Sequence, residues 1–142
     1  LHELIRSDAA DRNGIDNTPA DPAIIENLRT LAMMLQRIRA SLNAPILVSS
    51  GYRCAALNEL VGGQGKSDHM LGLAADFRVP AFGTPLDVAR HLAPLVDRLQ
   101  IGQLIYENFT VSWVHVAVPT PRKKANRVIT LNSAGAHVGV TA

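Results

Sequence analysis

The stretch that decides the fold is KSDHMLGLAADF, residues 66–77. It places His69 and Asp76 seven residues apart, with Gly72 between them and only small or apolar side chains from Gly72 to Asp76. Glycine lets the backbone turn sharply, so both polar side chains can meet at one point. Alternation along AADF puts Asp76 on the face opposite Phe77, and we expect Asp76 to point inward. A buried carboxylate needs a partner, either an arginine or a metal ion.

The composition predicts one globular domain over residues 1–142, with 47% hydrophobic residues and a formal net charge of +2. That charge is too small and too scattered for a nucleic-acid-binding surface. No apolar run reaches about 18 residues, so no membrane span is expected. Cys54 is the single cysteine, which excludes an internal disulfide and a thiolate zinc cluster. Any metal site must therefore use His, Asp and Glu. We expect a monomer.

The spacing of apolar residues predicts an α+β fold, with helices packed on a small, mainly antiparallel sheet. Asp21-Pro22 is a helix start, and apolar residues then recur at three- and four-residue steps up to Leu42. A second helix is expected over 54–61 and a third from Thr84, kinked near Pro94. Strands are expected at 46–50, 74–79, 103–107 and 112–118, the last two as a hairpin, with a possible edge strand at 127–131. Residues 62–72 and the basic segment 121–124 are predicted loops.

His115 is the second histidine with informative neighbours. In SWVHVAV, residues 112–118, alternation puts three valines on one face and Trp113, His115 and Ala117 on the other. His115 is then either a satisfied core histidine or a ligand held by a strand. Two histidines and one aspartate are a normal set for a catalytic zinc with an open fourth position, so we expect one Zn²⁺ per chain. The remaining histidines, His2, His91 and His137, are predicted surface residues.

Three segments together resemble a known family. Ser67-x-His69-x-x-Gly72-x-Ala74-x-Asp76 is followed by Trp113-x-His115, and SSGYRCAALN precedes both. This pattern is similar to the signature of the zinc D-Ala-D-Ala carboxypeptidase and L-alanyl-D-glutamate peptidase family, which cuts peptidoglycan stem peptides. The similarity runs from the GIDNTP segment, residues 14–19, to about Val118. The resemblance implies the α+β fold shared with the hedgehog signalling domain.

The resemblance also implies roles for individual residues. The zinc ligands would be His69, Asp76 and His115. Arg53 would bind the substrate and stabilise the developing oxyanion, and a fixed cation suits either an oxyanion or a carboxylate. Arg53 could instead be a surface residue or the structural partner of Asp76. Ser67 and Trp113 are assigned to substrate binding, and Ser67 is also expected to shape the ligand loop through a local hydrogen bond.

The general base is where this chain departs from the family pattern. Several members carry an acidic residue two or three positions before the last histidine, but here those positions are Trp113 and Ser112. Glu107 is the nearest upstream carboxylate. If Glu107 pairs opposite Trp113, it lies diagonal to His115, about 7–8 Å away. If it pairs opposite Ser112, it faces away, so one residue of strand register decides whether it can serve as the base.

The function predicted from the sequence is a zinc metallopeptidase that hydrolyses peptidoglycan stem peptides, as a D-Ala-D-Ala carboxypeptidase. Two alternatives remain open: an L-alanyl-D-glutamate endopeptidase of the phage endolysin type, and a zinc-containing wall-binding module without a working base. A purely structural domain with Asp76 paired to Arg53 would make the whole signature a coincidence. The chain opens LHELIRSDAADR, with no visible secretion signal, and it begins at Leu1. Localisation is therefore open, with periplasmic, extracellular or phage-encoded enzymes all compatible with a wall substrate.

Overall fold

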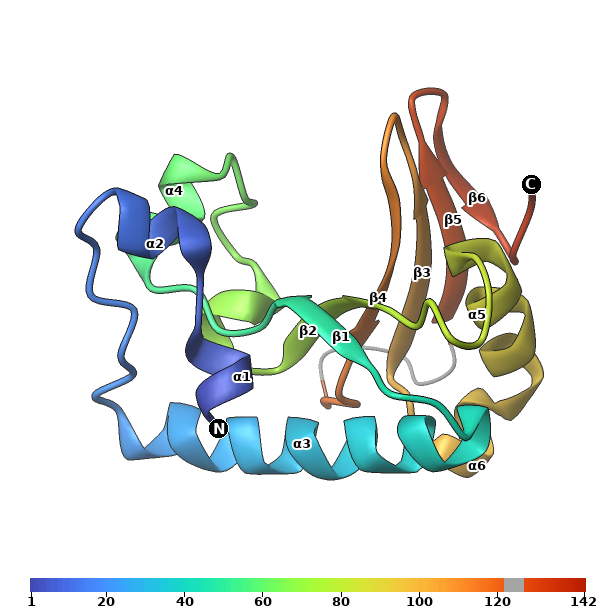
Figure 1. Cartoon of the computed structure of the whole chain (residues 1–142), viewed down its shortest axis with the longest axis horizontal. Helices are drawn as coiled ribbons and strands as arrows, with labels where there is room; N and C mark the ends of the chain where they lie inside the picture. Colours follow the sequence, from blue (N-terminus) through green and yellow to red (C-terminus); the bar gives the residue numbers. More distant parts are fainter. Residues whose placement is uncertain (122–126) are drawn as a thin grey trace.

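The computed structural model describes residues 1–121 and 127–142 and has an α+β architecture (Figure 1). Residues 122–124 of the predicted basic loop lie outside the described residues. The helices are α1 (His2–Ile5), α2 (Asp8–Arg12), α3 (Pro22–Leu42), α4 (Ala55–Leu60), α5 (Pro85–Leu92) and α6 (Val96–Leu99), with 3-10 turns η1 (Asp68–Leu71) and η2 (Ala93–Leu95). The strands are β1 (Leu47–Ser50), β2 (Ala74–Arg78), β3 (Gln103–Asn108), β4 (Ser112–Ala117), β5 (Arg127–Asn132) and β6 (Gly135–Val138).

Helix α3 is a long helix of 21 residues that lies beneath the sheet in Figure 1. It begins as the sequence predicts, because the Asp21 carboxylate accepts a hydrogen bond from Ala23 N at 2.8 Å and Pro22 occupies the first turn. It ends at Asn43, whose backbone is left-handed, with φ of 47°. Its buried residues are Leu28, Leu31, Met34, Leu35, Ile38 and Leu42.

The six strands form one sheet in the order β1-β2-β4-β3-β5-β6. All neighbouring strands pair antiparallel except β3 and β5, which are parallel. The predicted β3–β4 hairpin is confirmed, with Ile105 opposite His115 and Glu107 opposite Trp113. Strands β2 and β4, which carry candidate site residues, lie next to each other between β1 and β3. Hydrogen bonding to strands on both sides holds β2 and β4 in place.

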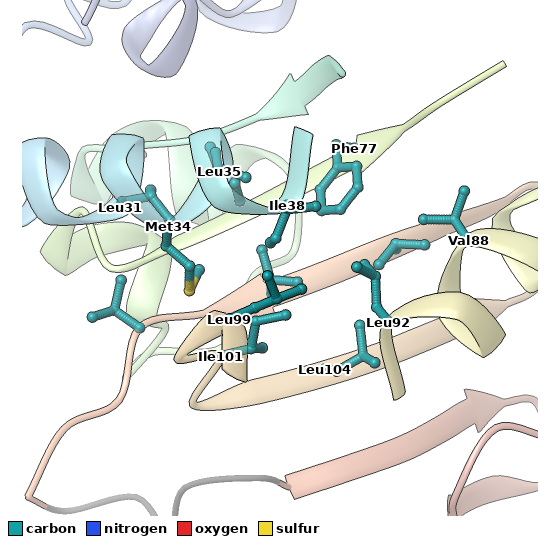
Figure 2. Packing of buried hydrophobic residues seen from close by; sticks show 14 of the residues in the cluster. Leu31, Met34, Leu35, Ile38, Phe77, Val88, Leu92, Leu99, Ile101 and Leu104 are labelled. Atoms are coloured by element: carbon teal, nitrogen blue, oxygen red, sulfur yellow. The ribbon is translucent and has the colours of Figure 1, made fainter. Parts of the chain in front are cut away.

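The two faces of the sheet have different surroundings. One face packs on α3, α5 and α6 and forms the hydrophobic core, in which Figure 2 shows Phe77 near Ile38 and Leu104 near Leu92. Full burial of each such side chain contributes roughly 1.5–3 kcal/mol. The opposite face carries Asp76 and His115, because they alternate with the core residues along β2 and β4. The candidate functional residues therefore lie on the face opposite the hydrophobic core.

Several sequence expectations need correction. Asp76 is buried, but it points to the face opposite the hydrophobic core, which Ala75 and Phe77 occupy instead. Strand β5 is not an edge strand, since it lies between β3 and β6, and β6 itself was not predicted. The predicted loop between Gly62 and Gly72 contains the turn η1. Helices α1 and α2 were also missed, because four or five residues carry too little periodicity.

Among the described residues, no helix combines the length and apolar character needed to cross a membrane.

The kink predicted near Pro94 is present, since α5 passes into η2 and then α6 at that point. Helix α5 begins with the expected capping box, in which Thr84 Oγ accepts from Asp87 N and the Asp87 carboxylate accepts from Thr84 N.

Candidate metal centre

Three potential ligand side chains, His69, Asp76 and His115, meet on the face of the sheet opposite the hydrophobic core. Each offers one ligand atom, and these atoms all lie within 4.8 Å of one another. His69 comes from η1, Asp76 from the middle of β2 and His115 from the middle of β4. All three are buried, with 4%, 7% and 9% of their surface exposed. The rigid strands therefore hold two of the three groups, and the turn after Ser67 supplies the third.

The turn that carries His69 depends on Gly72. The backbone of Gly72 is left-handed, with φ of 68°, and it ends η1 immediately before β2. A Cβ at this position would lie 3.0 Å from both Ile24 O and Leu28 Cγ, so α3 packs directly against the turn. The sequence-based expectation of a tight turn between the two ligands is confirmed.

His69 has a defined tautomer. Its Nδ1 lies 2.7 Å from the carbonyl oxygen of Gly51, which can only accept, so Nδ1 carries the proton and donates. The other ring nitrogen, Nε2, then has a free lone pair and lies 3.3 Å from Asp76 Oδ2. A backbone carbonyl that orients the far side of a ligand histidine is a usual second partner in metal sites.

Asp76 and His115 are cross-strand partners. They stand opposite each other in the β2–β4 register, and Asp76 Oδ1 lies 2.8 Å from His115 Nδ1. Burial by itself raises the pKa of Asp76, but the neighbouring imidazoles of His115 and His69 outweigh it and hold the pKa of Asp76 well below its usual range. The carboxylate is therefore ionised at neutral pH, as a metal ligand must be.

Arg53 lies beside the ligand cluster, and two of its guanidinium nitrogens make hydrogen bonds. Its Nη2 donates to Asp76 Oδ2 at 2.9 Å, and its Nε donates to Ser50 Oγ at 2.8 Å. The pairing of Arg53 with Asp76, which the sequence left open as a structural alternative, is thus present. It does not exclude a functional role, because the guanidinium has donors beyond the two that these bonds occupy.

The three side chains fit a zinc ion. The set contains two imidazoles and one ionised carboxylate, which are ordinary zinc ligands and leave a fourth position open. Ligands about 2.0–2.1 Å from a tetrahedral zinc lie roughly 3.3 Å from one another. Asp76 Oδ1 lies 2.8 Å from His115 Nδ1, Asp76 Oδ2 lies 3.3 Å from His69 Nε2, and one ligand atom from each residue lies within 4.8 Å of the others. His69 Nε2 and His115 Nδ1 are the nitrogens turned toward the carboxylate.

Glu107 occupies the register position that its assignment requires. It pairs opposite Trp113, so it shares a face with His115 and lies diagonal to it across the β3–β4 hairpin. Burial and the negative charge of Asp76 raise the pKa of Glu107, while His115 and Arg53 lower it only in part. Groups of the ligand cluster and Arg53 therefore influence the pKa of Glu107.

Ser67 and Trp113, the residues assigned to substrate binding besides Arg53, each lie two positions before a ligand histidine in the chain. Ser67 caps η1, and its Oγ accepts from His69 N at 3.3 Å, which is the local hydrogen bond expected from the sequence. Trp113 is half-buried and stacks on Phe109 near the end of the hairpin, with ring centroids 6.1 Å apart. Sequence reasoning missed Ser50 and Gly51, which hold Arg53 and His69. Their only signal was the position of Ser-Ser-Gly immediately before Tyr52-Arg53.

A family model described as Peptidase M15 matches residues 1–117, which include every residue of the cluster, Arg53 and Glu107. No curated protein matches the chain.

Proposed function

This chain belongs to the peptidase M15 family of zinc metallopeptidases acting on peptidoglycan peptides, and we propose that it is a D-Ala-D-Ala carboxypeptidase. The observation that carries the proposal is the convergence of His69, Asp76 and His115 beside Arg53 and Glu107. The proposal assigns zinc to the first three residues, and substrate contacts to Arg53, Ser67 and Trp113. It assigns the general base to Glu107.

His69, Asp76 and His115 would hold a zinc ion, which would supply Lewis acidity toward the scissile carbonyl and lower the pKa of water at the site. Arg53 contributes the fixed positive charge of the site. Because Ser50 and Asp76 already fix the guanidinium, its remaining N–H groups can bind an oxyanion or a substrate carboxylate with little loss of side-chain entropy. A terminal carboxylate is what distinguishes a D-Ala-D-Ala end from an internal peptide bond, and this favours the carboxypeptidase.

Glu107 performs the proton transfers in this proposal. Its carboxylate accepts a proton from the attacking water and delivers it to the leaving amine as the C–N bond breaks. A raised pKa makes the carboxylate a stronger base than an ordinary glutamate, which suits this role. The length of the side chain matters, because Glu107 reaches the cluster diagonally across the hairpin rather than from a directly opposite position.

A second candidate is an endopeptidase that cuts the internal L-Ala–D-Glu bond. A groove of about 580 Å³ adjoins Arg53 and Ser50 and runs along β1 between α1, α2 and α4. Such a groove has room for several residues of a peptide beyond the reacting bond. An endopeptidase binds substrate residues on both sides of that bond, whereas a carboxypeptidase binds only one residue on the C-terminal side.

The test measures zinc content and peptide release on purified protein with two stem peptides. One peptide ends in D-Ala-D-Ala, and the other has its terminal carboxylate amidated. Zinc near one per chain and chelator-sensitive loss of D-Ala from the first peptide alone support the carboxypeptidase. Product masses that show cleavage of L-Ala–D-Glu in both peptides support the endopeptidase. Zinc without release from either peptide contradicts both. His115→Ala should abolish release, while exposed His137→Ala is the matched control.

A further inference from the structure

The GIDNTP segment contains a buried side chain that the proposed function does not use. Asn17 is only 7% exposed, although the segment lies between α2 and α3 without helix or strand structure. The loop is shaped locally, since Asp16 Oδ1 accepts a hydrogen bond from Thr18 N at 2.9 Å. A buried asparagine in such a loop is informative, because its amide must find partners to offset the loss of water.

Within the described part of the chain, the Asn17 side chain makes three hydrogen bonds, and all of them go to backbone. Its Nδ2 donates to Ile5 O at 2.8 Å and to Tyr52 O at 2.9 Å. Its Oδ1 accepts from Cys54 N at 2.7 Å. Tyr52 and Cys54 are the residues on either side of Arg53. The single amide therefore holds the chain immediately before and immediately after the arginine of the site.

The backbone of Tyr52 and Arg53 makes two further hydrogen bonds, one to the N-terminal segment and one to η1. Tyr52 N donates to Leu4 O at 2.7 Å, and Arg53 N donates to His69 O at 3.1 Å. A Cβ on Gly51 would overlap the Leu4 carbonyl, so the N-terminal segment packs directly on this part of the chain. Residues 51–54 have no helix or strand structure. The backbone position from which the Arg53 side chain extends is therefore determined by these contacts rather than by a ladder of strand hydrogen bonds.

We propose that Asn17 is a positioning residue for Arg53. It does not touch the cluster itself, and its effect passes through the backbone of Tyr52 and Cys54 to the arginine side chain. This inference rests on the proposed function of Arg53. It predicts that the N-terminal segment, which lies far from the metal ligands in sequence, sets the geometry of the oxyanion contact. A displacement of about 1 Å at such a contact can cost as much as 100-fold in rate.

The test is a double-mutant cycle with Asn17→Ala and Arg53→Ala, read out as kcat/KM on the stem peptide that the wild type cleaves. Arg53→Ala should lower kcat/KM by about 10²–10³-fold, as loss of an oxyanion donor does. Asn17→Ala should lower it by between about tenfold and 100-fold when Arg53 is present. In the Arg53→Ala background the same change should cost less than about twofold, because the group through which it acts is gone.

Asn58→Ala is the matched control. Asn58 is also buried, at 4% exposure, and its amide also donates to a backbone carbonyl, that of Gln64 at 3.0 Å. Among the described residues its side chain has no hydrogen bond to residues 51–54, and the bond from its backbone N to Cys54 O, at 2.9 Å, is kept in Asn58→Ala. Both asparagine variants should lower the melting temperature. The effect of Asn58→Ala on kcat/KM should be small and equal in the two backgrounds.

Three outcomes would overturn the proposal: an equal loss from Asn17→Ala with and without Arg53, full activity of Asn17→Ala, or loss of zinc from that variant. If Asn17→Ala does not fold, Asn17→Asp replaces it in the cycle, since its carboxylate keeps the oxygen that accepts from Cys54 N but loses both donated bonds. A wild type that releases no peptide, or an Arg53→Ala variant with full activity, would instead contradict the proposed function. The two failures are therefore distinguished by different arms of the experiment.

Discussion

Asp76 stands opposite His115 across β2 and β4, with Asp76 Oδ1 2.8 Å from His115 Nδ1. The second oxygen of the same carboxylate lies 2.9 Å from Arg53 Nη2 and 3.3 Å from His69 Nε2. One carboxylate thus contacts both candidate ligand histidines and the arginine of the site. This makes Asp76 the residue on which the arrangement of the other three depends.

Asp76→Asn should remove zinc and activity together. The amide keeps the shape of the side chain but loses the negative charge that both a zinc ion and Arg53 require. Changes to the outer partners of metal ligands cost about 10–100-fold in metal affinity, and the loss of a ligand should cost more than that. Zinc titration monitored by metal analysis measures the effect. Asp97→Asn, at an exposed carboxylate in α6, is the control and should bind zinc as the wild type does.

Glu107→Gln should leave zinc in place and remove most turnover. Glutamine has nearly the same size but cannot accept the proton, and general-base catalysis contributes typically 10²–10⁴-fold. The measurement is kcat on the cleaved stem peptide, with zinc content determined on the same sample. Glu59→Gln, at an exposed position in α4, is the control. A Glu107→Gln variant with wild-type kcat would show that another group takes the proton.

Gly72→Ala should destabilise the protein and weaken zinc binding. The new methyl group would sit in a left-handed backbone, 3.0 Å from Ile24 O and Leu28 Cγ. Gly62→Ala separates the two causes, because Gly62 has a similar φ of 70° but no atom within 4 Å of the new Cβ. Backbone strain alone should cost roughly 1–2 kcal/mol there. Thermal melts should show a larger loss for Gly72→Ala, and equal losses would contradict the crowding by α3.

Asp87→Asn should lower stability at neutral pH but not in strong acid. The pKa of Asp87 is lowered from its ordinary value of 3.8 by hydrogen bonds from the Thr84 side chain and backbone. The folded state therefore binds the proton less readily than the unfolded chain. The stabilisation is fully present above the unfolded pKa and disappears as the pH falls through the folded pKa. The difference in melting temperature between wild type and variant should be largest at pH 7, where Asp87 is ionised, and should shrink as the pH is lowered to 2.

Thr84→Ala addresses the same capping box from its other side. The change removes the hydroxyl that accepts from Asp87 N at 3.2 Å, and N-cap losses of this kind cost about 1 kcal/mol. Because Asp87 would also lose its hydrogen bond from that hydroxyl, the stability of Thr84→Ala should depend less on acid pH than that of the wild type. An unchanged acid transition would contradict the assignment of the pKa shift to Thr84.

The sequence by itself determined the features that depend on short-range periodicity. The start and end of α3, the strand alternation that separates His115 from the core valines, and the turn at Gly72 all follow from neighbouring residues. The candidate ligands could be named for the same reason, since His69 and Asp76 are close in the chain. Short elements such as α1 and α2 were lost because they span about one turn each.

Only the tertiary structure decided how distant segments meet. The register of the β3–β4 hairpin places Glu107 opposite Trp113 rather than Ser112, and a slip of one residue would have turned the carboxylate to the other face. Strand β5 pairs with β3 across an intervening segment, so its place inside the sheet could not be read from its own composition. The contacts of Arg53 with Asp76 and of Asn17 with residues 52 and 54 join segments 23 to 37 positions apart. Such contacts depend on the packing of the whole domain, because no local pattern selects one distant partner over another.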